Sequence, residues 1–208
     1  MRTVKSLLLS AGAILVFVVA PAAFVAAEQL NPQAQNDLKA VNTTAALTDC
    51  RRQSAANTSG QAIFLSTASP KTYTGTVWQN VDCAGTTFRL SNGQRALVTV
   101  DFNAEADCNG NTPTNGQWCQ TRALLNGAEG LPIAAESSSF AFDSVAGGSS
   151  NWQAHSMGRG WEIRCANVNG CQYRLAVQTR MHDASVTGLW LDEIASHVTV
   201  TYGGPAAL

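Results

Sequence analysis

The sequence predicts an all-β fold, an antiparallel β-sandwich of the jelly-roll type. Apolar and polar residues alternate along the longer segments, and turns rich in Gly, Asn and Ser separate short runs of β-favouring residues. In residues 95–106, for example, Val98, Val100 and Phe102 share one face, and the polar residues between them share the other. Residues 172–181 repeat this alternation, which is typical of a strand buried on one side. Many short strands with frequent turns favour two packed sheets.

From residue 61 onward, β-favouring runs and turns follow one another. Asn92-Gly93 and Asn126-Gly127 are predicted hairpin turns, because Asn and Gly tolerate the left-handed backbone that tight turns need. No segment repeats at a fixed period, which argues against a propeller or a solenoid. Strands are expected near residues 61–67, 73–81, 86–91, 95–106, 118–125, 138–142, 151–157, 161–165, 171–181, 186–191 and 194–202.

Residues 28–60 differ from the rest of the chain because they lack β character. Asn31-Pro32 has the form of a helix start, with Pro at the first helical position, and Leu38 and Val41 follow at helical spacing. Such a helix would be short and marginal on its own. A short helix and a flexible linker therefore both remain open for this segment.

The N-terminus has the pattern of a secretory signal peptide. Arg2 and Lys5 precede an apolar run at residues 7–19, and small residues lead up to a cleavage position between Ala27 and Glu28. The alternative, a retained membrane anchor, is disfavoured because the apolar run is shorter than the roughly 20 residues that span a bilayer. The protein is therefore predicted to be exported, to the periplasm or to the extracellular space.

The expected organisation is a signal peptide at 1–27, a linker or short helix at 28–60, and a β-sandwich domain at 61–208. The chain carries 13 basic and 14 acidic residues, so its formal net charge of −1 provides no basic patch for nucleic acid. After signal cleavage no stretch approaches membrane-spanning length. We therefore expect no nucleic-acid partner, no membrane span and no cofactor.

The cysteines predict a disulfide framework. An even number of cysteines in an exported protein indicates disulfides. Zinc is disfavoured because no Cys-x-x-Cys spacing occurs. The residues are Cys50, Cys83, Cys108, Cys119, Cys165 and Cys171. Cys165 and Cys171 bracket an Asn-Gly turn, and Cys108 and Cys119 bracket a loop rich in Gly, Asn and Thr, so both pairs are expected to be local. The two remaining cysteines, Cys50 and Cys83, are then expected to pair with each other.

Several strand-like segments carry a resemblance to a known class of domain. They are residues 98–106, 119–127, 173–180 and 189–192, and the likeness extends over residues 61–202. The chain resembles secreted bacterial and phage-tail jelly-roll domains. This resemblance implies the sandwich fold and carries no assigned activity or site residue. Jelly-roll domains bind sugars or serve as structural modules, an analogy at the level of the fold.

Motifs that would indicate catalysis or metal binding are weak. The chain has no nucleophile elbow, no zinc-protease motif and no phosphate-binding loop. Asp107, Asn109 and Asn111 begin a calcium loop, but Thr112 and Trp118 stand where such a loop needs Gly and Glu. A turn stabilised by Asn and Asp side chains is the simpler interpretation. We therefore predict no metal site.

A hydrolase remains an alternative through acidic residues that a two-carboxylate glycosidase could use. Such an enzyme needs carboxyl groups about 5 to 10 Å apart, a distance that a sequence does not give. The acidic candidates are Glu136, Asp143, Asp183, Asp192 and Glu193, and the scattered histidines are His155, His182 and His197. The histidines lack ligand spacing, and no residue is predicted to be catalytic.

Aromatic residues give the most suggestive pattern. Trp152 and Trp161 flank a segment that contains His155 and Arg159. Indole rings beside polar side chains form sugar-binding surfaces, because a ring packs on the apolar face of a pyranose while its neighbours bind the hydroxyls. Trp152, His155, Arg159 and Trp161 are therefore the predicted binding residues. The alternative is that each indole belongs to the core of the sandwich.

The leading functional prediction is a secreted, non-enzymatic binding module for a cell-envelope glycan or a protein partner. The alternatives are a structural or assembly protein of the cell surface and a secreted hydrolase. The exposure of the indoles separates these predictions. An exposed aromatic site with polar neighbours favours binding, and burial of every Trp favours a structural role.

Overall fold

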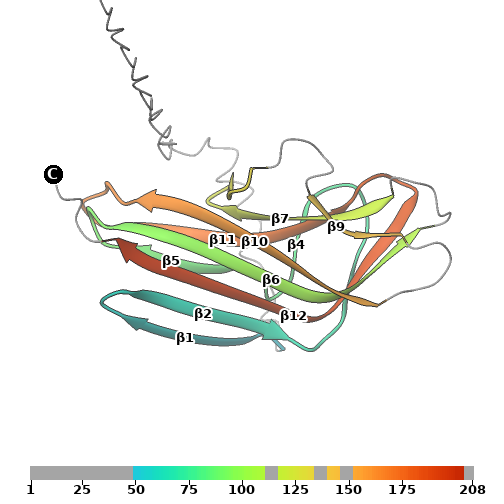
Figure 1. The fold of residues 1–208 in the computed structure, drawn as a ribbon, viewed down its shortest axis with the longest axis horizontal. Coiled ribbons are helices and arrows are strands. Elements are labelled where there is room, and N and C mark those ends of the chain that lie inside the picture. Colours follow the sequence, from blue (N-terminus) through green and yellow to red (C-terminus); the bar gives the residue numbers. More distant parts are fainter. Residues whose placement is uncertain (1–48, 111–116, 134–139, 146–151, 204–208) are drawn as a thin grey trace, which may run out of the picture.

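Two antiparallel β-sheets packed face to face form the protein (Figure 1). The computed structural model describes residues 49–110, 117–133, 140–145 and 152–203. The predicted all-β sandwich is confirmed. The predicted signal peptide and the predicted helix near Asn31 lie outside the described residues. Within these residues, no helix has the length and apolarity needed to cross a bilayer.

The first sheet contains the longest strands of the protein. Its strands, in order across the sheet, are β1 (Arg51–Asn57), β2 (Gly60–Thr67), β12 (Val186–Gly203), β6 (Arg95–Gly110) and β10 (Gln153–Arg164). The short strand β3 (Lys71–Tyr73) also pairs with β12. β1 and β10 are therefore the two edge strands of this sheet.

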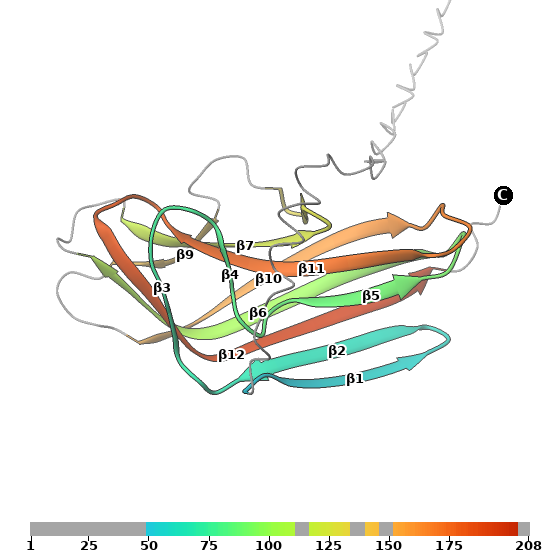
Figure 2. The same ribbon diagram turned by 180° about the vertical axis from the view of Figure 1, so that it is seen from behind.

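The second sheet is built around β11 (Cys171–Met181) and β7 (Trp118–Leu125), which pair with each other. The strands at its margins are β4 (Gln79–Asn80), β5 (Thr86–Leu90), β8 (Ala128–Glu129) and β9 (Ala141–Ser144). β4 and β5 pair with β11, and β8 and β9 pair with β7. Figure 2 shows β3, β4 and β5 on the side hidden in Figure 1.

The order of the strands is that of a jelly roll. The principal strands in chain order are β2, β5, β6, β7, β9, β10, β11 and β12. The first sheet joins the first, eighth, third and sixth of these, and the second sheet joins the second, seventh, fourth and fifth. Except for β7 and β9, which pair with each other, successive strands alternate between the sheets, and this interleaving is the double Greek key of the jelly roll.

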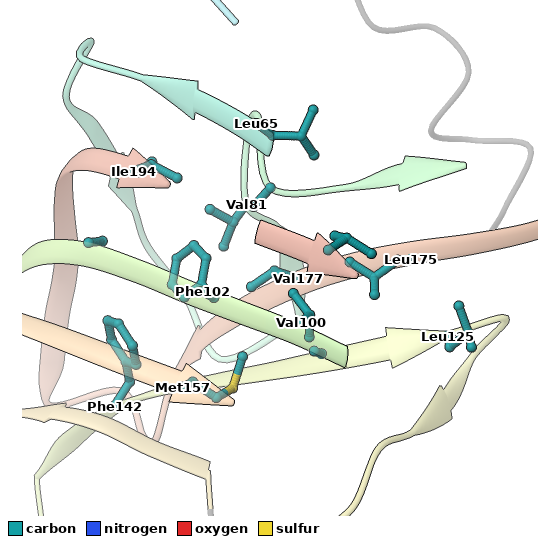
Figure 3. Packing of buried hydrophobic residues seen from close by; sticks show 14 of the residues in the cluster. Leu65, Val81, Val100, Phe102, Leu125, Phe142, Met157, Leu175, Val177 and Ile194 are labelled. Atoms are coloured by element: carbon teal, nitrogen blue, oxygen red, sulfur yellow. The ribbon is translucent and has the colours of Figure 1, made fainter. Parts of the chain in front are cut away.

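The core lies between the two sheets and follows from the alternation in the sequence (Figure 3). Val98, Val100 and Phe102 of β6 have no exposed surface, and Leu175 and Val177 of β11 are 1% exposed. Each fully buried side chain of this size stabilises the fold by about 1.5 to 3 kcal/mol relative to leaving it in water. The apolar faces predicted for residues 95–106 and 172–181 are therefore the faces that meet.

The three predicted disulfides are present: Cys50–Cys83, Cys108–Cys119 and Cys165–Cys171. Cys108–Cys119 joins β6 of the first sheet to β7 of the second, and Cys165–Cys171 closes the turn between β10 and β11. Cys50–Cys83 ties the start of β1 to the chain between β4 and β5. Disulfides of this number indicate an oxidising, extracellular type of environment.

The expectation that residues 28–60 lack β structure is wrong for residues 51–57, which form β1. Every residue of β1 is exposed, so no alternation of apolar and polar side chains marks it in the sequence. The strand forms through its pairing with β2, and the turn between them is fixed by Asn57, whose Oδ1 accepts the N–H groups of Ser59 and Gly60 at 2.8 and 3.0 Å.

Two pairs of predicted strands are single strands in the structure. The strands predicted at 151–157 and 161–165 both coincide with β10 (Gln153–Arg164), which continues through Gly158 and Gly160 in unbroken register with β6. Residues 186–191 and 194–202 belong to β12, where a bulge lies between Asp192 and Ala195. Glu193 in this bulge has a positive φ of 48°. Pairing with β6 holds Gly158 and Gly160 in the strand.

Candidate functional site

Trp161 belongs to the core of the sandwich. It is 7% exposed, and its Nε1–H donates a hydrogen bond to the carbonyl oxygen of Ala128 at 3.1 Å. The ring lies so close to Gly130 that a Cβ atom at that position would be 2.7 Å from the indole carbons. Trp161 therefore fills the space between β10 and the β8 region, where a ligand has no access to its faces.

Trp152 lies on the other side of the same sheet. It stands next to the first residue of β10, and an odd number of steps along an extended chain separates it from Trp161. Since successive side chains of a strand point to opposite faces, the two indoles diverge. Trp152 is 46% exposed. The structure therefore does not bring the two predicted indoles together.

His155 and Arg159 do not meet Trp152 either. They share the inward side of β10 with Trp161, by the same alternation. His155 Nε2 lies 3.3 Å from Oδ1 of Asp143, without the alignment of a hydrogen bond, and its ring packs on Phe142 of β9. Arg159 donates a hydrogen bond to the carbonyl oxygen of Gly158 at 2.7 Å. Both residues therefore sit along the seam where β10 of the first sheet meets the second sheet.

The ring that Trp152 does contact is that of Trp190 in β12. The two indoles pack edge to face with an interplanar angle of 73°. Trp190 is paired with Thr72 of β3 on one side and with Asp107 of β6 on the other. Gln153 pairs with Ala106. The preceding residue, Trp152, therefore lies beside the following residue of β6, Asp107. Trp152 and Trp190, here called the indole pair, therefore stand on the outer face of the first sheet on either side of Asp107.

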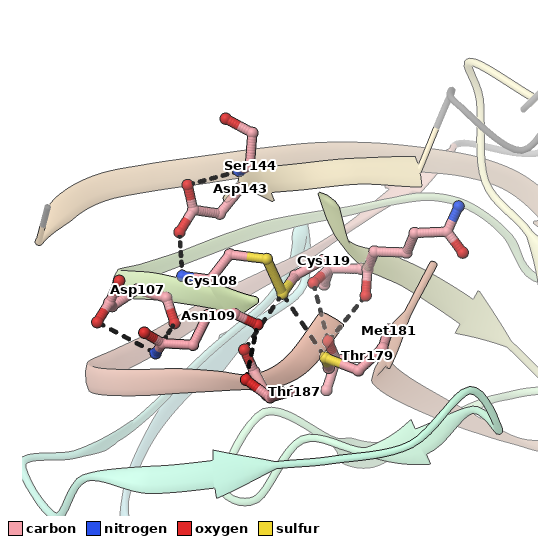
Figure 4. Close-up of a disulfide and its surroundings, with 12 residues drawn as sticks. Asp107, Cys108, Asn109, Cys119, Asp143, Ser144, Thr179, Met181 and Thr187 are labelled. Atoms are coloured by element: carbon pink, nitrogen blue, oxygen red, sulfur yellow. Dashed lines mark hydrogen bonds between the residues drawn. A yellow bond between two sulfur atoms is a disulfide. The ribbon is translucent and has the colours of Figure 1, made fainter. Parts of the chain in front are cut away.

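Asp107 is buried although its position in β6 faces outward. It is 7% exposed, and this burial follows from the two indoles that flank it. Its carboxylate accepts a hydrogen bond from Nδ2 of Asn109 at 3.2 Å, and Oγ1 of Thr187 donates to the carbonyl oxygen of Asn109 at 3.1 Å (Figure 4). Next to Asn109, the Cys108–Cys119 disulfide holds this end of β6 to the second sheet. The carboxylate and amide below the rings therefore have fixed positions.

Further polar side chains border the indole pair on the same face. Asp192 of β12 pairs with Glu105 of β6, one row along the sheet from Trp190 and Asp107, and both are half-buried. Thr72, on the far side of Trp190, is exposed. An exposed indole edge beside carboxylate, amide and hydroxyl groups has the two kinds of surface that a sugar ring uses, one apolar and one hydrogen-bonding.

The structure describes two of the three residues that begin the calcium loop, Asp107 and Asn109. The side-chain amide N–H of Asn109 donates to the carbonyl oxygen and the carboxylate of Asp107, as in a turn stabilised by Asn and Asp side chains. Asn111 lies outside the described residues. Among the described residues, no group of three or more His, Cys, Asp or Glu side chains is placed to hold a metal ion.

A second aromatic cluster lies on the outer face of the second sheet. Trp78 has the guanidinium carbons of Arg122 and Arg180 at 4.2 and 4.5 Å from a ring centroid, and Phe140 packs edge-on at 5.5 Å. Burial lowers the pKa of Arg122, the Glu129 carboxylate opposes this shift, and the charge of Arg180 adds to it. Cation–π contacts of this kind contribute about 0.5 to 2 kcal/mol each.

The polar groups of this arginine cluster largely satisfy one another. Nε and Nη2 of Arg122 donate to Oε1 of Gln178 at 3.0 and 2.8 Å, and Nη1 lies 3.8 Å from Glu129. Nε of Arg180 donates to Oε1 of Gln120 at 2.6 Å. These contacts explain the outward row of charged residues on β7 and β11 as packing across a sheet face.

The carboxylates that a hydrolase could recruit are held by local hydrogen bonds. Oδ2 of Asp143 accepts the N–H of Cys108 at 2.8 Å, and Oδ1 of Asp192 accepts the N–H of Glu193 at 2.7 Å. Asp183 accepts hydrogen bonds from the hydroxyl and the N–H of Ser185, and these bonds lower its pKa. Glu136 lies outside the described residues.

Comparisons with known proteins add no family to this description. No family model matches the chain, and a search of the curated proteins finds no significant match. The candidate site therefore depends on its own geometry. Its best-supported members are Trp152, which the sequence analysis selected, and Trp190 and Asp107, which it did not combine with Trp152.

Proposed function

We propose that this protein is an exported, non-enzymatic binding module that holds a cell-envelope glycan at the indole pair. The observation that carries the proposal is the position of Trp152. It is nearly half exposed, packs edge to face on Trp190, and stands beside a buried carboxylate on an open sheet face. Exposed aromatic surface bordered by polar groups is typical of a ligand-binding site.

The chemistry of the neighbours favours a sugar as the ligand. Glu105 and Asp192, both half-buried, supply carboxylate acceptors, and the exposed Thr72 supplies a hydroxyl, all on the face where the indoles stand. Carboxylates accept hydrogen bonds from sugar hydroxyls, while the apolar face of the ring packs on indole. A polymer in the envelope fits an open sheet face, because such a face can follow several sugar units.

Export is part of the same proposal. The first 27 residues have the pattern of a cleaved signal peptide, and the three disulfides fit a protein that works outside the reducing cytosol. Envelope glycans are found in that compartment. The resemblance of the strand segments to secreted bacterial jelly-roll domains agrees with this placement.

The test is co-sedimentation of the purified, oxidised protein with insoluble peptidoglycan, chitin and cellulose. We expect the wild-type protein to sediment with one of these polymers, and Trp152→Ala to lose at least tenfold in affinity while keeping its melting temperature within a few degrees. Phe64→Ala is the matched control, because Phe64 is 40% exposed on another strand of the same sheet. Its affinity should remain unchanged.

Two results contradict the proposal. Failure to bind any of the three polymers removes the glycan ligand. Equal affinity of the wild-type protein, Trp152→Ala and Trp190→Ala for a polymer that does bind removes the indole pair as the site.

A further inference from the structure

The edge strand β1 is an ordered and open template for another strand. Its residues pair with those of β2 in one continuous register, from Arg51 with Ser66 to Asn57 with Gly60. The Cys50–Cys83 disulfide fixes one end of β1, and the Asn57 turn fixes the other. In both Figure 1 and Figure 2, β1 lies at the outer margin of the first sheet. In the part of the chain that the structure describes, no strand pairs with its other side.

β1 lacks most of the features by which natural edge strands avoid pairing. Those features are charged side chains, above all Lys, and Pro, a bulge or a covering segment. The charged residues of β1, Arg51 and Arg52, both lie at one end of the strand. Residues 51–57 contain neither Pro nor Lys, and their pairing with β2 has no bulge. By contrast, at the other edge of the sheet, Gly160 of β10 exchanges two main-chain hydrogen bonds with Leu131, at 2.8 and 3.1 Å. Among the described residues, the chain therefore covers part of the β10 edge itself, and no strand covers β1.

The direction of the main-chain groups follows from the hairpin. Asn57 and Gly60 close a two-residue turn, and the closing pair of such a hairpin is a hydrogen-bonded pair. Hydrogen-bonded and non-hydrogen-bonded pairs alternate along antiparallel strands. The N–H and C=O groups that bond to β2 are therefore those of Arg51, Gln53, Ala55 and Asn57. The N–H and C=O groups of Arg52, Ser54 and Ala56 point away from β2, toward the open side of the strand.

We propose that a second copy of this chain adds to this edge, β1 against β1, antiparallel and centred on Ser54. In this register Ser54 of one copy exchanges hydrogen bonds with Ser54 of the other, and Arg52 does so with Ala56. These are the residues whose main-chain groups point out of the sheet. The first sheets of the two copies then form one continuous sheet around a two-fold axis.

The charges of β1 suit pairing with itself in this register. Arg51 and Arg52 are its only charged residues, and both lie at one end. The antiparallel arrangement places Arg51 opposite Asn57 and Arg52 opposite Ala56, and the residues at the centre, 53–55, are uncharged. The Arg51 positions of the two copies are then about 20 Å apart at ~3.3 Å per residue. This exceeds the Debye length of about 8 Å at physiological ionic strength, so the arginines do not repel.

The dimer leaves the proposed glycan site open. The indole pair stands on β12 and beside β10, so β2 separates it from the pairing edge. A dimer would carry two such sites on one continuous sheet. The pairing does not depend on glycan binding, and either proposal can fail without the other.

The experiment is sedimentation equilibrium on the oxidised protein over roughly 10 µM to 1 mM, because an edge-strand interface is small and its dimer is expected to be weak. The wild-type protein should shift from monomer to dimer across this range. Ser54→Pro should stay monomeric, because Pro removes an N–H that points to the second copy and not to β2. Ser54→Ala is the control and should dimerise as the wild type does.

A charge pair makes the test independent of any effect of Pro on folding. Ser54→Lys alone and Ser54→Asp alone each place two like charges opposite each other at the two-fold axis, so both should be monomeric. An equimolar mixture of the two should form a heterodimer. The proposal is overturned by a wild-type protein that stays monomeric throughout, by Ser54→Pro that associates like the wild type, or by a mixture that associates no more than its components.

Discussion

Replacing Trp161 and Trp152 separately by Ala tests the placement of the two indoles on opposite faces of β10. Trp161 is 7% exposed and donates a hydrogen bond to Ala128. A buried Trp→Ala change leaves a cavity and costs about 3 to 5 kcal/mol. Loss of the bond to the Ala128 carbonyl adds about 1 kcal/mol. At about 2 to 4 °C per kcal/mol for a domain of this size, the melting temperature of Trp161→Ala should fall by at least roughly 6 °C.

Trp152→Ala should behave differently, because Trp152 is 46% exposed and forms no part of the core. Burial of about half of its ring against Trp190 is worth roughly 1 kcal/mol. Urea unfolding followed by far-ultraviolet circular dichroism measures both variants, with equal m-values required for the comparison. Equal losses of stability in the two variants would refute the assignment of Trp161 to the core and Trp152 to the outer face.

Replacing Cys50 and Cys83 by Ser should lower the free energy of unfolding by roughly 3 to 4 kcal/mol, from the entropy of a loop with a sequence separation of 33, as measured by urea unfolding. Burial raises the pKa of Tyr73 to about 12, so the folded state keeps a proton that the unfolded chain loses near pH 10. Stability should therefore be full below pH 10 and fall by up to roughly 3 kcal/mol toward pH 12, and Tyr73→Phe should flatten this dependence in alkaline melts. Prolonged chelation should leave the melting temperature unchanged, and a drop restored by Ca²⁺ would instead make Asp107 and Asn109 ligands.

The sandwich was predictable because its core strands alternate cleanly. Val98, Val100 and Phe102 are apolar and buried, and the polar residues between them face outward, so the period of two is visible in the sequence. The disulfides were predictable for a related reason, since two of the three pairs close short loops. Both features depend on residues that are near one another in the chain.

β1 was not predictable from the same signal. Neither of its faces is covered, so selection for burial leaves no alternation among Arg51–Asn57. Its strand conformation comes from pairing with β2 and from the Asn57 turn. A pattern that reports burial cannot detect a strand whose side chains are all exposed.

The predicted binding residues combined Trp152 with an indole on the opposite face of the sheet, because two separate strands were predicted where the structure has β10 alone. Had residues 151–165 been taken as one strand, the odd separation of Trp152 and Trp161 would have placed them on opposite faces. Gly158 and Gly160 both stay in register with β6. The number of residues between two side chains therefore predicts whether they share a face only when both are known to lie on one continuous strand.

The contact between Trp152 and Trp190 depends on the pairing of strands that are far apart in the chain. Trp190 reaches Trp152 only because β12 and β10 are both neighbours of β6, which places Asp107 between them. Nothing local in residues 189–192 indicates which strand will lie beside them, and the bulge after Asp192 changes the facing of the residues that follow. The position of Asp107 gives the strongest reason to regard the pair as a site: an outward carboxylate is ordinarily hydrated, and here two large rings flank it and leave it 7% exposed. The indoles are held in place by that arrangement before any ligand arrives, so a ligand that stacks on Trp152 need not order the ring on binding.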